Sequence, residues 1–200
     1  MRVSDEAHAS GAPINPTRTR SSEESPVPPK PLRSVLFLCT GNSARSILAE
    51  SVLQHRGGSL FRAYSAGSHP TGQVHPMALE VLAEAGYPHE GFESKSWDRF
   101  ATQGAPPIDF VLTVCDRAAG EACPIWPGQP ITAHWGLPDP AAIEGPTAIL
   151  RDAFRQALVR IEDRIAHFLR LARSASHPDD WQIGLTQVEF PEESKPEPAT

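Results

Sequence analysis

The segment Ser34–Ser46 runs from an apolar strand pattern through a short polar loop into a helix pattern. Its apolar part, Val35–Leu38, is rich in strand-forming residues and is typical of a parallel strand covered on both faces. Gly41 and Asn42 follow and tolerate positive φ, so successive backbone N–H groups can converge on one point. Helical spacing begins near Ala44 and brings the partial positive charge of a helix N-terminus behind the loop. The segment therefore predicts a strand-loop-helix unit that binds an anion.

Two residues of this segment predict its chemistry. Cys39 ends the strand, and Arg45 lies six residues later, at the start of the helix. A free cysteine has a pKa of ~8.5, which helix N-termini, cations and donated hydrogen bonds lower. The helix start, Arg45 and the Ser46 hydroxyl could each act in this way, and the planar guanidinium could hold two oxygens of a tetrahedral oxyanion. We expect a thiolate nucleophile, against the alternative of a buried strand-end cysteine. The candidate substrate-binding residues are Thr40, Gly41, Asn42, Ser43, Ala44, Arg45 and Ser46.

The ends of the chain differ in composition from its middle. Residues 1–33 hold six prolines and no apolar periodicity, whereas residues 177–200 hold four prolines, six acidic residues and one lysine. We expect a disordered or loosely packed extension over 1–33, a catalytic domain over 34–171 and an acidic, proline-containing tail over 172–200. The formal net charge of −6, without a basic cluster, gives no indication of nucleic-acid binding.

The sequence shows neither a secretory signal pattern nor the ~18 apolar residues of a membrane span. We therefore expect a cytoplasmic protein without membrane association. The chain has three cysteines, an odd number, and in a reducing compartment this argues against a structural disulfide framework. The thiols are expected either to react or simply to be buried.

Strand and helix patterns alternate after the first helix, which ends at Gly57–Gly58. The expected elements are a strand over 60–64, a helix over 76–85, a strand over 108–115, a strand over 131–135 and a long amphipathic helix over 147–171. Such alternation predicts an α/β fold with a parallel sheet, whose ligand site lies beyond the carboxyl ends of its strands. Cys39, Cys115 and Asp139 each end or follow a strand, so they are expected to meet at one edge of the sheet.

Asp139 lies between Pro138 and Pro140 in a loop of reduced conformational freedom. If it reaches the anion loop, it can protonate the oxygen that leaves as Cys39 attacks. The alternative is a turn residue without a catalytic role.

Cys115 and Cys123 are separated by seven residues in an alanine-rich segment. The two thiols could pair and form a relay with Cys39, or Cys115 could be buried and Cys123 incidental. A zinc site from Cys115, Cys123 and His134 lacks a fourth ligand and the usual spacing, so no metal is predicted.

Four segments together resemble the thiol-dependent arsenate reductases built on the low-molecular-weight phosphotyrosine phosphatase fold. They are Cys39–Ser46, Tyr64–Gly67, Cys115–Pro124 and His134–Pro140. The resemblance spans about residues 34–171. It implies a three-layer α/β sandwich with a central four-stranded parallel sheet.

The resemblance also implies a role for each candidate residue. Cys39 would attack arsenate, Arg45 and the loop amides would hold its oxygens, and Asp139 would be the acid. Cys115 would then attack the Cys39 sulfur and expel arsenite, and Cys123 would attack Cys115 to leave a disulfide. Arsenate is the implied substrate, with phosphate and sulfate as oxyanion mimics. No bound cofactor is implied, and a thioredoxin-like protein or a low-molecular-weight thiol would be the external reductant.

Some features depart from the pattern of these relatives. Many of them separate the last two cysteines by six residues, and many have a second cysteine at the position of Ala44. Potassium has been associated with some relatives, at positions that match Asn42, Glu50 and Ser65. The further carboxylate expected near Ser96 is absent, because Trp97 follows it, which agrees with predicting no metal.

Two other functions remain as hypotheses. The first is a protein-tyrosine or small-phosphoester phosphatase that uses Cys39, Arg45 and Asp139. Tyrosine phosphatases of this fold place aromatic residues just after the Asp-Pro pair, whereas Ala141 and Ala142 follow here. The second is a non-enzymatic module that senses oxyanions or binds a partner through its tails.

Overall fold

The computed structural model describes residues 32–116, 118, 124–175 and 177–186. In chain order its elements are β1 (Arg33–Cys39), α1 (Arg45–Gly57), β2 (Phe61–Gly67), α2 (Pro76–Glu84), α3 (Asp98–Ala101), β3 (Phe110–Thr113), β4 (Ile131–His134), the 3-10 helix η1 (Pro140–Ala142), α5 (Thr147–Ser174) and α6 (Pro178–Thr186). None of the helices in these ranges has the length and apolar character that a membrane crossing requires.

The four strands form one parallel sheet in the order β2-β1-β3-β4. Cys39 at the end of β1 pairs with Gly67 of β2, and Leu38 pairs with Thr113 of β3. Because all strands run in the same direction, their carboxyl ends lie at one edge of the sheet. The predicted fold class, an α/β fold with a central four-stranded parallel sheet, is confirmed.

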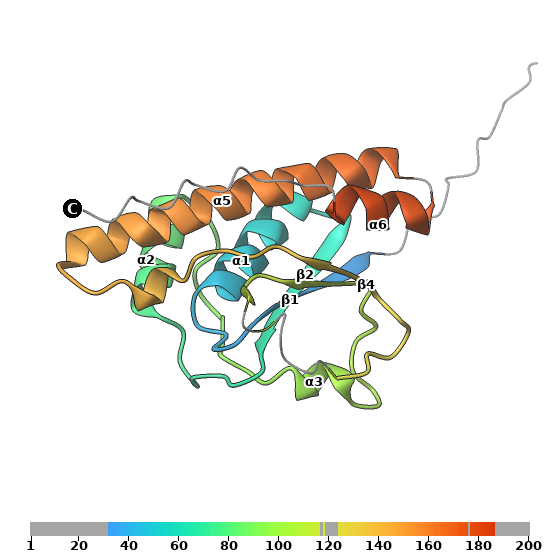
Figure 1. The fold of residues 1–200 in the computed structure, drawn as a ribbon, viewed down its shortest axis with the longest axis horizontal. Helices are drawn as coiled ribbons and strands as arrows, with labels where there is room; N and C mark the ends of the chain where they lie inside the picture. Colours follow the sequence, from blue (N-terminus) through green and yellow to red (C-terminus); the bar gives the residue numbers. More distant parts are fainter. Residues whose placement is uncertain (1–31, 117, 119–123, 176, 187–200) are drawn as a thin grey trace, which may run out of the picture.

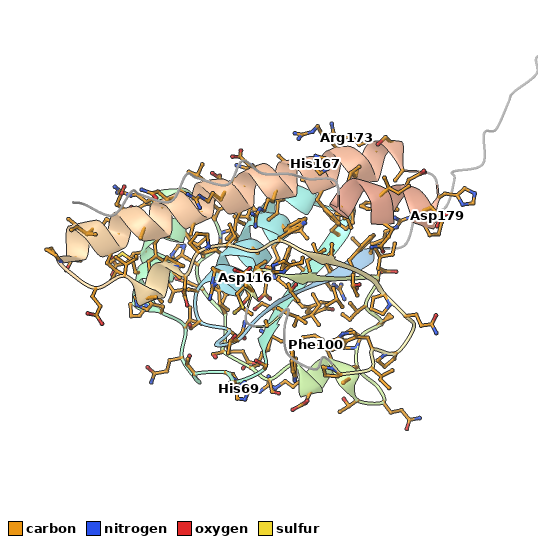
Figure 2. The ribbon with its side chains drawn as sticks, in the orientation of Figure 1. His69, Phe100, Asp116, His167, Arg173 and Asp179 are labelled. Carbon is orange, nitrogen blue, oxygen red and sulfur yellow. The ribbon has the colours of Figure 1, made fainter. Side chains whose placement is uncertain are left out.

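The side chains of β1 alternate between two cores on opposite faces of the sheet. Val35 and Phe37 pack in the larger core with α1, α2 and α5, and Leu36 and Leu38 pack in a smaller core with α3. Figure 1 shows α5 and α6 on one side of the sheet and α3 on the other, and Phe100 of α3 is labelled in Figure 2. The fold thus has three layers, as expected.

Three strands differ in length from the sequence prediction. β2 continues to Gly67 rather than ending at residue 64, because it pairs with β1 along its full length. β3 and β4 are shorter than the apolar runs that predicted them. Residues such as Ile108 and Val114 are buried beside β3 without belonging to it. An apolar run in the sequence predicts which residues are buried, whereas the bounds of a strand depend on hydrogen bonding to its neighbouring strands.

Residues 178–186 do not form the loosely attached tail that the sequence analysis expected. They form α6, in which Trp181 and Leu185 are buried, and the Trp181 ring lies 4.7 Å from that of Phe110. Gln182 Nε2 donates a hydrogen bond to the Thr132 carbonyl of the edge strand β4. Two apolar residues four apart anchor this segment although its average composition is acidic and polar. The expectations for residues 1–31 and 187–200 concern chain outside the described residues and stay predictions.

Candidate active site

The loop between β1 and α1 turns its carbonyl groups toward the segment that follows β2. Three backbone N–H groups of that segment donate to loop carbonyls: His69 to Thr40 (2.9 Å), Thr71 to Gly41 (3.0 Å) and His75 to Ser43 (2.9 Å). A trans peptide points its N–H away from its C=O, so the N–H groups that follow these carbonyls face the opposite side. One of them, the N–H of Asn42, lies 3.1 Å from Cys39 Sγ. The loop therefore gathers backbone donors around this sulfur.

The tight turn of the loop depends on Asn42 and on Gly67 of β2. Asn42 has a positive φ of 44°, while Gly41 is not among the described glycines with positive φ. Asparagine tolerates this conformation because its short polar side chain forms local hydrogen bonds. A Cβ on Gly67 would overlap the Thr40 carbonyl oxygen and lie 2.9 Å from the Asn42 nitrogen. Gly67 thus lets the end of β2 approach the loop closely.

Cys39 is 3% exposed, and its Sγ lies 2.9 Å from Ser46 Oγ. Burial raises the pKa of the Cys39 thiol, and hydrogen bonds from Ser46 and Asn42 oppose that rise. The sequence prediction of a lowered pKa is therefore wrong, since desolvation by burial outweighs the hydrogen bonds that stabilise the thiolate. The predicted contact with Ser46 is present.

A buried network of hydrogen bonds connects the Ser46 hydroxyl to the carboxylate of Glu50. Asn42 Nδ2 donates to Ser46 Oγ (2.9 Å) and to Ser65 Oγ (2.8 Å), and Ser65 Oγ donates to Glu50 Oε2 (2.5 Å). Lys95 Nζ lies 3.9 Å from the same carboxylate oxygen. Burial raises the pKa of Glu50, while the Lys95 charge and the Ser65 hydrogen bond lower it. Sequence reasoning did not find Lys95, because no local pattern connects it to Glu50.

Arg45 faces the turn after β4. Its Nη1 donates to the Leu137 carbonyl (2.8 Å), and its Nη2 forms an ion pair with Asp139 Oδ2 (2.9 Å). Its Nε is buried and has no hydrogen-bond partner among the described residues. Asp139 Oδ1 accepts from the N–H of Ala141, which fixes the carboxylate at the start of η1. Asp139 thus lies beside the loop.

Cys115 lies against the same loop, two residues beyond the end of β3. It is 2% exposed, and its Sγ lies 3.6 Å from Thr40 Oγ1 and 3.4 Å from the N–H of Ala118. Both sulfurs therefore contact the same loop, Cys39 through the N–H of Asn42 and Cys115 through the Thr40 hydroxyl. Cys39 and Cys115 both are free thiols. Cys123 lies outside the described residues.

In the sequence, His134 is weighed as a zinc ligand and begins the segment His134–Pro140 that carries part of the resemblance. Its Nδ1 lies 2.8 Å from Thr113 Oγ1 and its Nε2 lies 3.0 Å from Asp116 Oδ1, so both ring nitrogens have protein partners. The described ranges contain no group of three or more His, Cys, Asp or Glu side chains that could hold a metal ion.

The chain belongs to the low molecular weight phosphotyrosine protein phosphatase family, whose model matches residues 34–177. An arsenate reductase of Halalkalibacterium halodurans is 37% identical over 134 residues, which are 67% of this chain and 93% of the relative. Two solved structures have the same fold. One, described as an arsenate reductase in the phosphate binding state, has a TM-score of 0.56 and 26% identity over 70% of this chain and 98% of that chain. The other, the thioredoxin-dependent arsenate reductase of Corynebacterium glutamicum, has a TM-score of 0.51 and 27% identity over 72% of this chain and 65% of that chain. The resemblance to arsenate reductases of this fold is confirmed.

Proposed function

We propose that the protein is an arsenate reductase in which three cysteines act in succession. The observation that carries this proposal is the second buried thiol, Cys115, 3.6 Å from Thr40 of the oxyanion loop. Arsenate and phosphate have similar charge and shape, so the loop alone does not separate reduction from hydrolysis. A hydrolase of this kind needs Cys39, Arg45 and Asp139, whereas a reductase also needs thiols that supply two electrons. Relatives named arsenate reductase support the same choice.

In the first step arsenate binds to the loop N–H groups and to the unpaired Nε of Arg45. The Cys39 sulfur attacks arsenic, an As–S bond forms and an As–O bond breaks. The thiol proton leaves with the departing oxygen, so the monoanion H₂AsO₄⁻ and the thiol give a thio-arsenate monoanion and water. Asp139 accepts this proton as a carboxylate and passes it to the leaving oxygen. Deprotonation during attack suits a thiol whose resting pKa is raised.

In the second step Cys115 attacks the sulfur of Cys39. An S–S bond forms, the As–S bond breaks and its electron pair stays on arsenic, which passes from As(V) to As(III). The Cys115 proton goes to the product, which leaves as H₂AsO₃⁻. The close approach of Cys115 to Thr40 supports this step, because productive attack needs the two sulfurs to be placed before reaction.

In the third step the Cys123 sulfur attacks the Cys115 sulfur. The Cys115–Cys123 bond forms, the Cys39–Cys115 bond breaks, and the Cys123 proton goes to the Cys39 sulfur, which is then free for another cycle. An external dithiol then reduces the Cys115–Cys123 disulfide. A thioredoxin-like protein is the reductant that the Corynebacterium glutamicum relative supports, and a low-molecular-weight thiol is the alternative.

Variants of the two later cysteines test this order. The purified protein is mixed with arsenate and a thioredoxin system, arsenite is quantified, and disulfides are mapped by mass spectrometry. Cys115→Ser should release no arsenite and keep its affinity for phosphate. Cys123→Ser should release one equivalent and then stop, with Cys39 bonded to Cys115. Continued turnover by either variant would remove that cysteine from the mechanism.

The same assay separates the other two hypotheses. Hydrolysis of p-nitrophenyl phosphate without arsenite formation would indicate a phosphatase, for which the Cys39, Arg45 and Asp139 arrangement is sufficient. Binding of phosphate without either reaction would indicate an oxyanion-binding module.

A further inference from the structure

The residue after Cys115 is fixed by a histidine from the neighbouring strand. His134 Nε2 lies 3.0 Å from Asp116 Oδ1, and His134 Nδ1 lies 2.8 Å from Thr113 Oγ1. Thr113 and His134 are paired in register at the ends of β3 and β4. The imidazole is therefore held at both nitrogens and connects the two strand ends to the segment that carries Cys115. Asp116 is labelled in Figure 2.

Gly136 leaves the space in which this contact forms. A Cβ at that position would overlap Asp116 Oδ1 and lie 2.8 Å from His134 Nε2. The carboxylate and the imidazole thus rest directly on the backbone of the turn that follows β4. A side chain at Gly136 would have to displace both Asp116 Oδ1 and His134 Nε2.

A buried arginine fixes that turn from the helix layer. Arg164 of α5 donates hydrogen bonds to the carbonyls of Trp135 and of Gly136, the latter at 2.8 Å. Burial lowers the pKa of Arg164 to about 10, and the negative charge of Asp116 opposes this shift. The Asp116 side chain itself is 87% exposed.

The contacts of His134 with Thr113 and Asp116 lie where strand pairing of β3 ends, just before and after Cys115. β3 ends at Thr113, and Cys115 Sγ keeps its contacts with Thr40 Oγ1 and the N–H of Ala118. A contact between two exposed polar side chains contributes little to global stability. The effect of the Asp116–His134 contact should therefore fall on the placement of the Cys115 sulfur rather than on folding.

We propose that Asp116 and His134 are positioning residues for the thiol step, and that their contact holds Cys115 where it can attack the sulfur of Cys39. In that attack the Cys39–Cys115 bond forms, the As–S bond breaks and arsenic takes the electron pair. The inference rests on the proposed function, and it adds two residues that touch neither arsenate nor the reacting sulfur of Cys39.

The test is single-turnover arsenite release from the full chain, without external reductant, in four variants. These are Asp116→Asn, His134→Ala, the double variant and, as a matched control, Glu144→Gln, which changes an exposed acid on the loop after Asp139. Phosphate affinity is measured by calorimetry and thermal stability by circular dichroism. Asp116→Asn and His134→Ala should each slow arsenite release by about tenfold or more, because a misplacement of ~1 Å can cost ~100-fold in rate. Phosphate affinity and the melting temperature should stay near wild type, and Glu144→Gln should match wild type throughout.

The double variant distinguishes a shared role from two separate ones. Residues that act through one contact are not additive, so the double variant should be no slower than the slower single variant. Additive losses, unchanged release rates or an equal loss of phosphate affinity would each overturn the inference. If the wild-type protein releases no arsenite, the proposed function fails and this inference fails with it. Release by wild type and by all variants at one rate would overturn the positioning role alone.

Discussion

Arg45 and Asp139 form an ion pair beside the oxyanion loop, with 2.9 Å between Nη2 and Oδ2. The Leu137 carbonyl accepts a second hydrogen bond from the same guanidinium, so the turn after β4 orients Arg45 before any ligand arrives. The buried Nε remains without a partner among the described residues and is available to an oxyanion. Such prior orientation reduces the entropy that binding would otherwise lose.

Arg45→Lys should weaken phosphate binding by about 10- to 100-fold. A lysine supplies one ammonium group, which cannot bond to Leu137, Asp139 and an oxyanion with the fixed geometry of a guanidinium. The loss of a charge-assisted hydrogen bond costs ~1.5–3 kcal/mol, and each 1.4 kcal/mol is about tenfold in affinity. Calorimetric titration with phosphate measures the change, with Arg62→Lys on the exposed face of β2 as the control. A variant that binds phosphate within twofold of wild type would contradict this role.

Asp139→Asn should slow the first chemical step while leaving oxyanion binding intact. The amide keeps the size of the side chain but neither accepts nor donates the proton that moves with the leaving oxygen. General acid-base catalysis contributes ~10²–10⁴-fold to a rate. The rate of arsenite release in a single turnover should therefore decrease by a factor in that range. Phosphate affinity should not decrease, because the substitution removes a negative charge next to the anion. A fall in affinity with an unchanged rate would assign Asp139 to binding instead.

The oxyanion loop could be predicted from the sequence because its parts are consecutive. A strand, a turn with Asn42 and a helix start follow one another, and a parallel sheet brings Cys115 and Asp139 to the same edge. The pKa direction of Cys39 could not be predicted in this way. It depends on burial under segments that are distant along the chain, and local residues suggested only the groups that favour a thiolate.

The contacts between polar groups that are distant along the chain also could not be predicted from the sequence. Lys95 reaches Glu50, and Asp116 reaches His134, only because the loops around the sheet fold back on it. The helix α6 was missed for a different reason. Acidic residues and prolines dominate the average composition of residues 177–200, and this average concealed the anchoring positions of Trp181 and Leu185.

Gly67→Ala should disturb the oxyanion loop. The added methyl would overlap the Thr40 carbonyl oxygen, which is backbone and cannot move without the loop. Overpacking of this kind typically costs ~1–3 kcal/mol, and both the melting temperature and phosphate affinity should fall. Gly104→Ala is the matched control, because Gly104 has a positive φ but nothing within 4 Å of an added Cβ. It should lose stability through strain and keep its phosphate affinity, whereas unchanged binding in Gly67→Ala would show that the loop tolerates the displacement.

Glu50→Gln should change how stability depends on pH. Burial raises the pKa of Glu50 in the folded protein, so the folded state binds its proton more tightly than the unfolded chain does. The stability linked to this proton is fully present below the unfolded pKa of ~4.3 and is lost as pH rises through the higher folded value. Glutamine does not titrate, so the melting temperature of Glu50→Gln relative to wild type should rise between about pH 4 and pH 7. Thermal unfolding at several pH values measures this slope, with Glu144→Gln as the exposed control, whose difference from wild type should change much less. A difference that is constant or falls with pH would mean that Lys95 and Ser65 offset the cost of burying the Glu50 carboxylate.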